Sequence, residues 1–383
     1  MNIALVAPTY LPARRANTIQ VMKMAAALTE LGHLVRVSVP GPKPDISWDQ
    51  LARHYGLSCQ FPVEWLPAHP ILRRYDYGLR AVTWARGWGA DLLYTRLLQA
   101  AALGSFLGMP TIYEIHDIPK GILAPGLFRG FLKGHGAYRL VPVSHALSGD
   151  LTQRFESPNT PPFTVVAPDG VDLSRYTNLL PSSQARRSLS LPDTFTAGYS
   201  GHLYAGRGVE MIFKMAENLP NIHFLLVGGE PEDVQRLKSY AEAMRLTNLT
   251  LTGFVPNAEL PCYQAACDVL LMPYQQRVAA SSGGDISRYL SPMKLFEYLA
   301  CGRVILAGNL PVLGEVLNPE NAILLPINDL DAWTTALRNV MTNPEHYARL
   351  SIQAKLDASN YTWEDRARRI LAGLEAKGEG LHA

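Results

Sequence analysis

Cysteines are few in this 383-residue sequence, and they are not arranged for cross-linking or metal binding. The four residues are Cys59, Cys262, Cys267 and Cys301, without a Cys-x-x-Cys pair and without zinc-ligand spacing to histidine. This pattern argues against a disulfide framework and a structural zinc site. We expect buried free thiols.

Long apolar runs and a leader segment are also missing. No stretch approaches the roughly 20 apolar residues that a membrane-spanning helix requires. Residues 1–6 carry no charged segment ahead of the apolar residues and run directly into Pro8, so no signal peptide is expected. We expect a cytoplasmic protein and leave open a peripheral contact with the inner membrane face.

A strong charge of either sign is absent as well. The chain has 35 Lys and Arg against 33 Asp and Glu, with the basic surplus in the first half. This distribution suits an anionic substrate or an anionic membrane surface, but it lacks the concentrated basic stripe of a nucleic-acid-binding protein. We therefore expect no nucleic-acid partner. The sequence does not indicate an oligomeric state.

Short apolar runs alternate with helical patterns along the whole chain, which predicts an α/β fold with parallel sheets. In the first half, the strands are expected at 3–7, 34–39, 91–95, 111–115, 140–143 and 164–166, with helices over 18–31 and 97–107. In the second half, strands are expected at 196–200, 224–227, 249–251, 269–272, 303–307 and 322–325, with helices over 208–218, 231–245 and 292–300. Residues 178–194 read as a linker.

The loop 200–208 follows a predicted strand and opens a predicted helix. Such a loop offers backbone N–H groups and the positive end of a helix to a phosphate, and Arg207 adds a charged donor. It is neither a P-loop nor a G-x-G-x-x-G fingerprint, so a plain tight turn is an equally good interpretation.

The segment 291–302 combines a helix start with two charged residues. Ser291 is a natural N-cap and Pro292 suits the first helical position. Lys294 falls in the first turn, where the helix dipole disfavours a cation unless an anionic ligand binds there. Glu297 is flanked by apolar residues and is suited to accept hydrogen bonds from ribose hydroxyls. The alternative is a surface lysine and a partly exposed glutamate.

His116 stands at the end of a predicted strand, where ligands bind in parallel sheets. It is a candidate for a hydrogen bond to a sugar hydroxyl, with a purely structural histidine as the alternative. Glu114 and Asp117 carry the same ambiguity, and Arg96 follows the neighbouring strand. Residues 65–96 are rich in Trp, Tyr and Arg, which is typical of an interfacial membrane segment or of an ordinary amphipathic helix.

Taken together, these segments resemble the family-4 (GT4-like) retaining glycosyltransferases of the GT-B fold. The segments that carry the resemblance are 201–208, 228–229, 251–255, 266–273, 297–302, 115–117, 143–144, 168–172 and 361–363. The resemblance implies two Rossmann-like parallel-sheet domains facing each other across a cleft. The expected boundaries are 1–180 for the acceptor domain, 195–360 for the nucleotide-sugar donor domain and 361–383 for a C-terminal helix that crosses back to the first domain.

The resemblance also implies roles for individual residues. Arg207 would bind the donor diphosphate with Lys294 nearby, Glu297 the ribose, and His116 the transferred sugar. The remaining donor-binding residues would be Gly201, His202, Val255, Ser291, Pro292, Met293, Leu295, Asn17 and Thr18. Further contacts to the donor sugar or the acceptor would come from Arg96, Asp117, Asp285 and Tyr289.

Three positions depart from the family pattern. Tyr289 stands where the family's E-x7-E motif has its first Glu, so Asp285 is a candidate replacement. His202 stands where the family has Arg, and the N-terminal loop 14–18, which contains Asn17 and Thr18, stands in place of the family's Gly-Gly pair. These departures affect donor identity more than reaction class.

The implied activity is transfer of a sugar from a nucleotide-diphosphate donor to an acceptor hydroxyl with retention of configuration. It needs no metal and no cofactor, since the nucleotide-sugar is the substrate. The acceptor would be a glycan, a lipid-linked molecule or a small molecule. The alternatives are a nucleotide-sugar 2-epimerase on the same fold and a non-catalytic nucleotide-sugar-binding protein.

Overall fold

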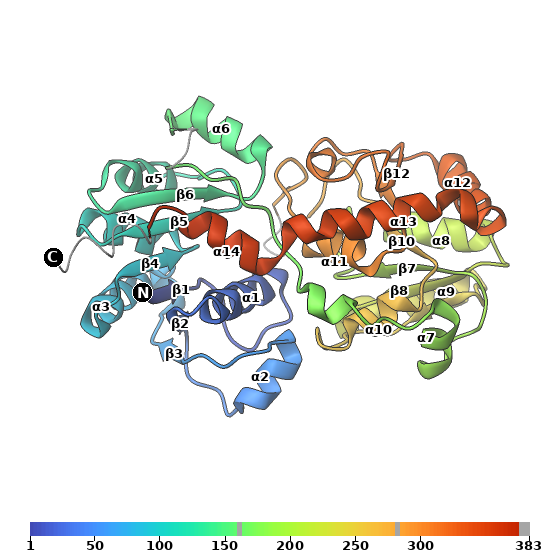
Figure 1. Ribbon diagram of the computed structural model, residues 1–383, viewed down its shortest axis with the longest axis horizontal. Coiled ribbons are helices and arrows are strands. Elements are labelled where there is room, and N and C mark those ends of the chain that lie inside the picture. The colour runs from blue at the N-terminus through green and yellow to red at the C-terminus, as the bar shows by residue number, and fades with distance from the viewer. Residues whose placement is uncertain (159–162, 280–283, 375–383) are drawn as a thin grey trace. The chain divides into compact units, whose positions relative to one another are not determined.

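The computed structural model describes residues 1–158, 163–279 and 284–374, which divide into two compact units (Figure 1). The first unit contains Met1–Asp169 together with the C-terminal segment from Trp363, and the second contains Gly170–Thr362. Each unit is built on a six-stranded sheet whose paired strands all run parallel. The predicted α/β class is therefore confirmed.

The sheet of the first unit has the strand order β3-β2-β1-β4-β5-β6. Its strands are β1 (Asn2–Val6), β2 (Leu34–Pro40), β3 (Val63–Leu66), β4 (Leu92–Thr95), β5 (Thr111–Ile115) and β6 (Ala137–Pro142). The helices are α1 (Ala16–Glu30), α2 (Trp48–Tyr55), α3 (Tyr75–Trp88), α4 (Leu98–Phe106), α5 (Ala124–Lys133), α6 (His145–Phe155) and, from the far end of the chain, α14 (Trp363–Leu371). The central strands β1, β4 and β5 are buried almost throughout, because helices cover both faces of a parallel sheet.

The sheet of the second unit has the order β12-β11-β10-β7-β8-β9. Its strands are β7 (Thr196–Ser200), β8 (His223–Val227), β9 (Leu249–Leu251), β10 (Val269–Met272), β11 (Val304–Gly308) and β12 (Ile323–Leu325). Its helices are α7 (Ser182–Ser188), α8 (Val209–Asn218), α9 (Pro231–Ala243), α10 (Leu260–Ala265), α11 (Met293–Cys301), α12 (Leu330–Thr342) and α13 (Pro344–Ala358).

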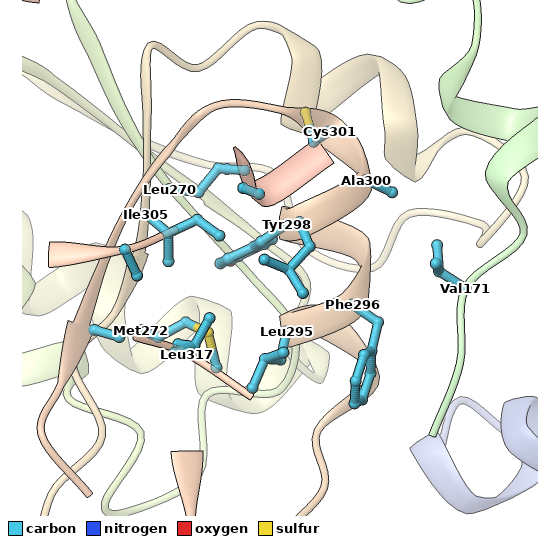
Figure 2. Close-up of a cluster of buried hydrophobic side chains, with 14 of the residues drawn as sticks. Val171, Leu270, Met272, Leu295, Phe296, Tyr298, Ala300, Cys301, Ile305 and Leu317 are labelled. Atoms are coloured by element: carbon cyan, nitrogen blue, oxygen red, sulfur yellow. The ribbon is translucent and has the colours of Figure 1, made fainter. Parts of the chain in front are cut away.

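Helix α11 is packed directly on the second sheet (Figure 2). Tyr298 points toward the strand residues Leu270 and Ile305, and Leu295 lies on the side of Met272 and Leu317, so the apolar side of the helix forms part of the core. Figure 2 shows Phe296 on another side of the same helix. This packing fixes the direction in which the polar residues of α11 can project.

Residues 178–194 are not a plain linker, because α7 lies within them and packs onto the second unit. Ala185 is buried in the core, and Arg186 donates from Nη1 to Asp268 Oδ2 at 2.8 Å and to the carbonyl of Ala266 at 3.0 Å. The short, polar α7 gives little hydrophobic periodicity, so the sequence does not predict it.

Several other sequence-based expectations differ in detail from the structure. The strand expected at 164–166 is a single bridge between Thr164 and Leu140. The short edge strand β3 and helix α2 lie in segments that were not assigned from the sequence. Segment 65–96 contains α3, which buries one apolar face, as expected of an amphipathic helix.

The cysteines are all unbridged, but the expectation that they are buried is only half right. Cys267 and Cys301 are buried, Cys59 is half-buried and Cys262 is exposed. Across residues 1–158, 163–279 and 284–374, no helix combines the length and the apolar character that a membrane crossing requires.

Candidate functional site

The loop between β7 and α8 approaches neighbouring backbone so closely that it requires glycine. A Cβ atom added to Gly206 would lie 1.9 Å from the carbonyl oxygen of Arg277, and one added to Gly208 would lie 1.9 Å from that of Pro273. Gly201 has a φ of +128°, and Gly228 packs against its carbonyl. The loop is therefore a tightly seated platform at the carboxyl end of the sheet, where parallel sheets bind ligands.

Arg207 is held within this platform by an aromatic side chain. Its Nη1 donates to the hydroxyl of Tyr274 at 2.9 Å, and its guanidinium carbon lies 5.1 Å from the centre of the Tyr274 ring. Its Nε is buried and makes no hydrogen bond within the described residues. Arg207 thus carries a fixed positive charge with one unused donor.

Lys294, in the first turn of α11, is a second half-buried cation whose donor atom is itself buried. Its Nζ lies 3.6 Å from the centre of the Tyr199 ring and has no hydrogen-bond partner among the described residues. Burial lowers the pKa of this ammonium well below its usual range, and the charge of Arg207 lowers it further. The expected alternative of a surface lysine is therefore wrong.

The ammonium of Lys294 lies against the platform itself. A Cβ atom on Gly201 would lie 2.8 Å from Lys294 Nζ. Two cations whose buried donor atoms make no hydrogen bond among the described residues destabilise the unliganded protein, because the hydration that these atoms lose is not replaced. A bound anion such as a diphosphate would satisfy both, and the N-termini of α8 and α11 would add favourable dipoles.

Glu297 is buried on α11 one turn beyond Lys294 and is held by a chain of polar side chains. Gln264 Nε2 donates to Glu297 Oε2 at 3.1 Å, and the hydroxyl of Tyr176 donates to Gln264 Oε1 at 2.8 Å. Gln264 also donates to Ser200 Oγ at 3.1 Å. A carboxylate held in this way is oriented to accept further hydrogen bonds from a ligand.

The start of α11 differs from the sequence-based expectation. Pro292 is the N-cap, with an extended ψ of 124°, and Met293 is the first helical residue. Ser291 therefore lies before the cap and is not the N-cap. Leu295 is buried in the core, so it offers only its backbone to a ligand.

The other candidates in the second unit are distributed around the platform. The ring of His202 stacks on Tyr204 at 4.7 Å, and Val255 is half-buried after β9. Asp285 Oδ1 accepts hydrogen bonds from the backbone N–H groups of Val278 at 3.1 Å and Ser287 at 2.9 Å. Tyr289 is buried. Part of the candidate loop around Asp285, residues 280–283, lies outside the described residues.

In the first unit, His116 lies just beyond the end of β5 and contacts the buried Glu114. Its Nε2 is 2.5 Å from Glu114 Oε1, and its side chain is 29% exposed whereas that of Glu114 is fully buried. Burial and the charge of Arg96 lower the pKa of His116 to about 4, although Glu114 opposes this shift. The imidazole is neutral at pH 7.

Four further candidates of the first unit make contacts within it. Arg96 Nη1 donates to Gln20 Oε1 at 2.6 Å and to the carbonyl of Asn17 at 3.3 Å. The hydroxyl of Thr18 is buried, 2.5 Å from that of Thr9. Asp117 Oδ1 accepts from the N–H of Ile118 at 2.8 Å, and its Oδ2 accepts from Lys120.

The structure adds residues that the sequence did not single out. The Tyr199 ring lies beside Lys294 Nζ, and the Tyr274 ring lies beside the guanidinium of Arg207. Gln264 donates a hydrogen bond to Glu297. Arg366 of α14 forms an ion pair with Glu114 in the first unit, with Nη2 to Oε2 at 2.9 Å. These tyrosines and this glutamine belong to no sequence motif, so the sequence does not mark them as site residues. Arg366 is so far from Glu114 along the chain that residue spacing does not predict their contact.

The two units, each built on a six-stranded parallel sheet, have the GT-B fold. HepE of Anabaena, solved in complex with UDP, superposes with a TM-score of 0.72 at 18% identity, over 98% of this chain and 100% of that one. Sucrose-phosphate synthase of Thermosynechococcus elongatus superposes with a TM-score of 0.74 at 18% identity, over the whole of both chains. At this identity the likeness establishes the fold.

Sequence comparison then identifies the domain. Residues 194–343 match the family model described as Glycosyl transferases group 1, so this part of the chain is a domain of that kind. This match contains the glycine platform, Arg207, Lys294 and Glu297.

Curated relatives support the same class. The GDP-mannose-dependent alpha-(1-6)-phosphatidylinositol monomannoside mannosyltransferase of Mycolicibacterium smegmatis is 27% identical over 228 residues, which are 56% of this chain and 57% of the relative. The putative teichuronic acid biosynthesis glycosyltransferase TuaH of Bacillus subtilis is 31% identical over 122 residues, 32% of this chain and 28% of the relative. The chain spans between about a quarter and about three fifths of the length of these two relatives.

Proposed function

We propose that this protein transfers a sugar from a nucleoside-diphosphate sugar to an acceptor hydroxyl. The observation that carries the proposal is the pair of cations Arg207 and Lys294, whose buried Nε and Nζ atoms make no hydrogen bond among the described residues and lie at the glycine platform within the matched domain. A departing nucleoside diphosphate gains negative charge at this point of the reaction, and preorganised cations stabilise it.

The remaining polar groups receive roles that follow from their chemistry. Glu297, oriented by Gln264, accepts hydrogen bonds from the ribose hydroxyls. The neutral imidazole of His116 hydrogen-bonds a hydroxyl of the transferred sugar. Arg207 and Lys294 supply the charge stabilisation that a divalent cation supplies in other transferases, so the reaction needs neither a metal nor a cofactor. We assign retention of configuration on the family resemblance.

The test is turnover of candidate donors by two variants of the proposed donor site, one in the platform and one on α11. Arg207→Ala and Glu297→Ala are each expected to lower the rate of nucleoside-diphosphate release in the presence of acceptor, by about 100-fold or more for Arg207→Ala. Arg236→Ala serves as the matched control, because Arg236 is exposed on α9 and forms an ion pair with Asp233 on the same helix. Its turnover should equal that of the wild type.

Three results would contradict the proposal. Near-normal turnover in both Arg207→Ala and Glu297→Ala would show that the donor does not bind at these residues. Tight nucleotide binding without any product, against a broad acceptor panel, would favour the non-catalytic binding protein. Isomerised donor formed without acceptor would favour a 2-epimerase.

We also propose that the acceptor is lipid-linked and that the first unit contacts a membrane surface peripherally. Ile71 before α3 is 92% exposed, and Ile122 before α5 is 96% exposed. The basic residues Arg73 and Arg74 directly follow Ile71 and Leu72. Exposed apolar side chains beside arginines are the combination that binds an anionic lipid surface.

A further inference from the structure

The carboxylate of Glu114 is fully buried in β5, and it is satisfied from two sides. Gln20 Nε2 donates to its Oε1 at 2.7 Å, on the side where His116 also approaches. The hydroxyl of Tyr94 and Nη2 of Arg366 donate to its Oε2. A buried carboxylate with such a complete set of donors is ionised and held in one orientation.

Arg366 is the part of this set that comes from the C-terminal helix of the first unit. Its side chain is 3% exposed, and its Nε donates to the carbonyl of Pro168 at 2.8 Å. Its Nη2 donates to the carbonyl of Ala167 at 3.2 Å, and its Nη1 to the hydroxyl of Tyr94 at 3.2 Å. The guanidinium is thus fixed by groups other than Glu114, and it presents its charge to the carboxylate from a set direction.

Arg139 fastens the other end of the same helix. It lies in β6, and its guanidinium donates to the carbonyls of Ile370 and, at 2.7 Å, Ala372. These carbonyls belong to the end of α14, where hydrogen-bond acceptors are otherwise unpaired. The helix is therefore anchored at both Arg366 and its C-terminus.

The ionised carboxylate determines which nitrogen of His116 carries the proton. A carboxylate only accepts hydrogen bonds, so the 2.5 Å contact requires that His116 Nε2 donates. A neutral imidazole protonated on Nε2 leaves the lone pair on Nδ1. The His116 ring then offers an acceptor to a substrate hydroxyl.

We propose that Glu114 and Arg366 are positioning residues that fix the ring orientation and the Nε2–H tautomer of His116. This rests on the proposed function only in the role given to His116, since the tautomer itself is a property of the unliganded protein. The C-terminal helix α14 thereby supplies part of the His116 site in the first unit, although Arg366 lies 250 residues further along the chain.

The substitution Glu114→Gln gives a sharp test, because it is isosteric but can both donate and accept. Two donors, Tyr94 and Arg366, face the Oε2 position, whereas Gln20 is the one hydrogen-bond donor besides His116 that faces the Oε1 position among the described residues. The amide orientation with its oxygen at the Oε2 position is therefore favoured. The amide NH₂ group then faces His116, whose Nε2 must accept. The tautomer is expected to invert to Nδ1–H.

The measurement is long-range ¹H–¹⁵N correlation NMR of the full-length protein labelled at histidine. The chain has ten histidines, and the His116 signals are assigned by their loss in His116→Gln. The wild type should show the Nε2–H pattern, and Glu114→Gln the Nδ1–H pattern. In the same preparations, kcat for sugar transfer should fall about 10-fold to 100-fold in Glu114→Gln, by analogy with the loss of a carboxylate that orients a metal-bound histidine.

Two further variants separate positioning from a general loss of stability. Arg366→Lys keeps a cation beside Glu114 but loses the planar fork, so it should retain the Nε2–H tautomer and lose less activity than Glu114→Gln. Arg368→Lys is the matched control on α14, since Arg368 is 61% exposed and pairs with Asp365. It should leave both the tautomer and the turnover unchanged.

An Nδ1–H tautomer in the wild type would overturn the proposal, and so would an unchanged tautomer in Glu114→Gln. A loss of activity equal in Glu114→Gln and Arg366→Lys would also overturn it, since it would indicate a structural effect alone. If the tautomer inverts as expected while the wild type transfers no sugar from any donor, the proposed function fails and the positioning of His116 stands.

Discussion

Replacing Lys294 with methionine should stabilise the unliganded protein while weakening its binding of a nucleoside diphosphate. Lys294 Nζ is buried against the Tyr199 ring without a hydrogen-bond partner among the described residues, close to the charge of Arg207. Methionine preserves the length of the side chain and removes the group that lacks a partner. A residue that is unfavourable for folding and favourable for binding is typical of a functional site.

The size of each effect follows from the contacts. A buried polar group without a partner costs about 1–3 kcal/mol, and the cation–π contact with Tyr199 returns part of this, about 0.5–2 kcal/mol. We therefore expect Lys294→Met to raise the free energy of unfolding by about 1 kcal/mol. A hydrogen bond to a charged phosphate oxygen contributes about 1.5–3 kcal/mol, so the Kd for the nucleotide should rise about 10-fold to 100-fold.

The assay is urea unfolding of the wild type and the variant without ligand, followed by thermal unfolding with increasing nucleoside diphosphate. Lys214→Met on α8 is the control, because Lys214 is exposed in the same unit. Lys294→Met should unfold at higher urea than the wild type and show a smaller ligand-induced rise in Tm. A variant that is destabilised without ligand, or that responds to nucleotide like the wild type, would refute the reasoning.

Two further predictions concern the first unit. Burial raises the pKa of Asp169 to about 7, whereas an unfolded aspartate titrates near 4, so the native state binds more protons between these values. The free energy of unfolding should then fall as pH rises through this window, by up to about 1.4 kcal/mol per pH unit. Asp169→Asn should remove this decline, which is measured by comparing urea midpoints at pH 5 and pH 7.5. An equal pH dependence in both proteins would contradict the prediction. The double substitution Ile71→Ser and Ile122→Ser should lower co-sedimentation with anionic phosphatidylglycerol vesicles several-fold without changing nucleotide binding, and unchanged sedimentation would exclude these side chains from the membrane contact.

The sequence predicts the sheets well because parallel strands are buried on both faces. The apolar runs at β1, β8 and β10 leave few alternatives, and glycines such as Gly32 end helices where a positive φ is needed. Strand β3 is not predicted because it is a short edge strand, Val63–Leu66, in which no residue is fully buried. Residues 164–166 lie beside the edge strand β6 and form only one bridge.

The candidate site is predictable in its motifs but not in its contacts. Glycine spacing and helix-start residues point to Arg207, Lys294 and Glu297, since each stands in a segment with its own local signal. The burial of Lys294 on Tyr199 depends on the packing of α11 against β7 and β10, which no local pattern encodes. The ion pair between Glu114 and Arg366 joins residues that only the folded first unit brings together.

The central claim is that the glycine platform with Arg207 binds a nucleoside diphosphate. The most direct test is a thermal-shift titration of the wild type and Arg207→Ala with UDP, GDP and ADP. Ligand that binds only the native state raises Tm by mass action, so one of the three should raise the Tm of the wild type and leave that of Arg207→Ala nearly unchanged. No shift with any of the three, or an equal shift in both proteins, would contradict the account.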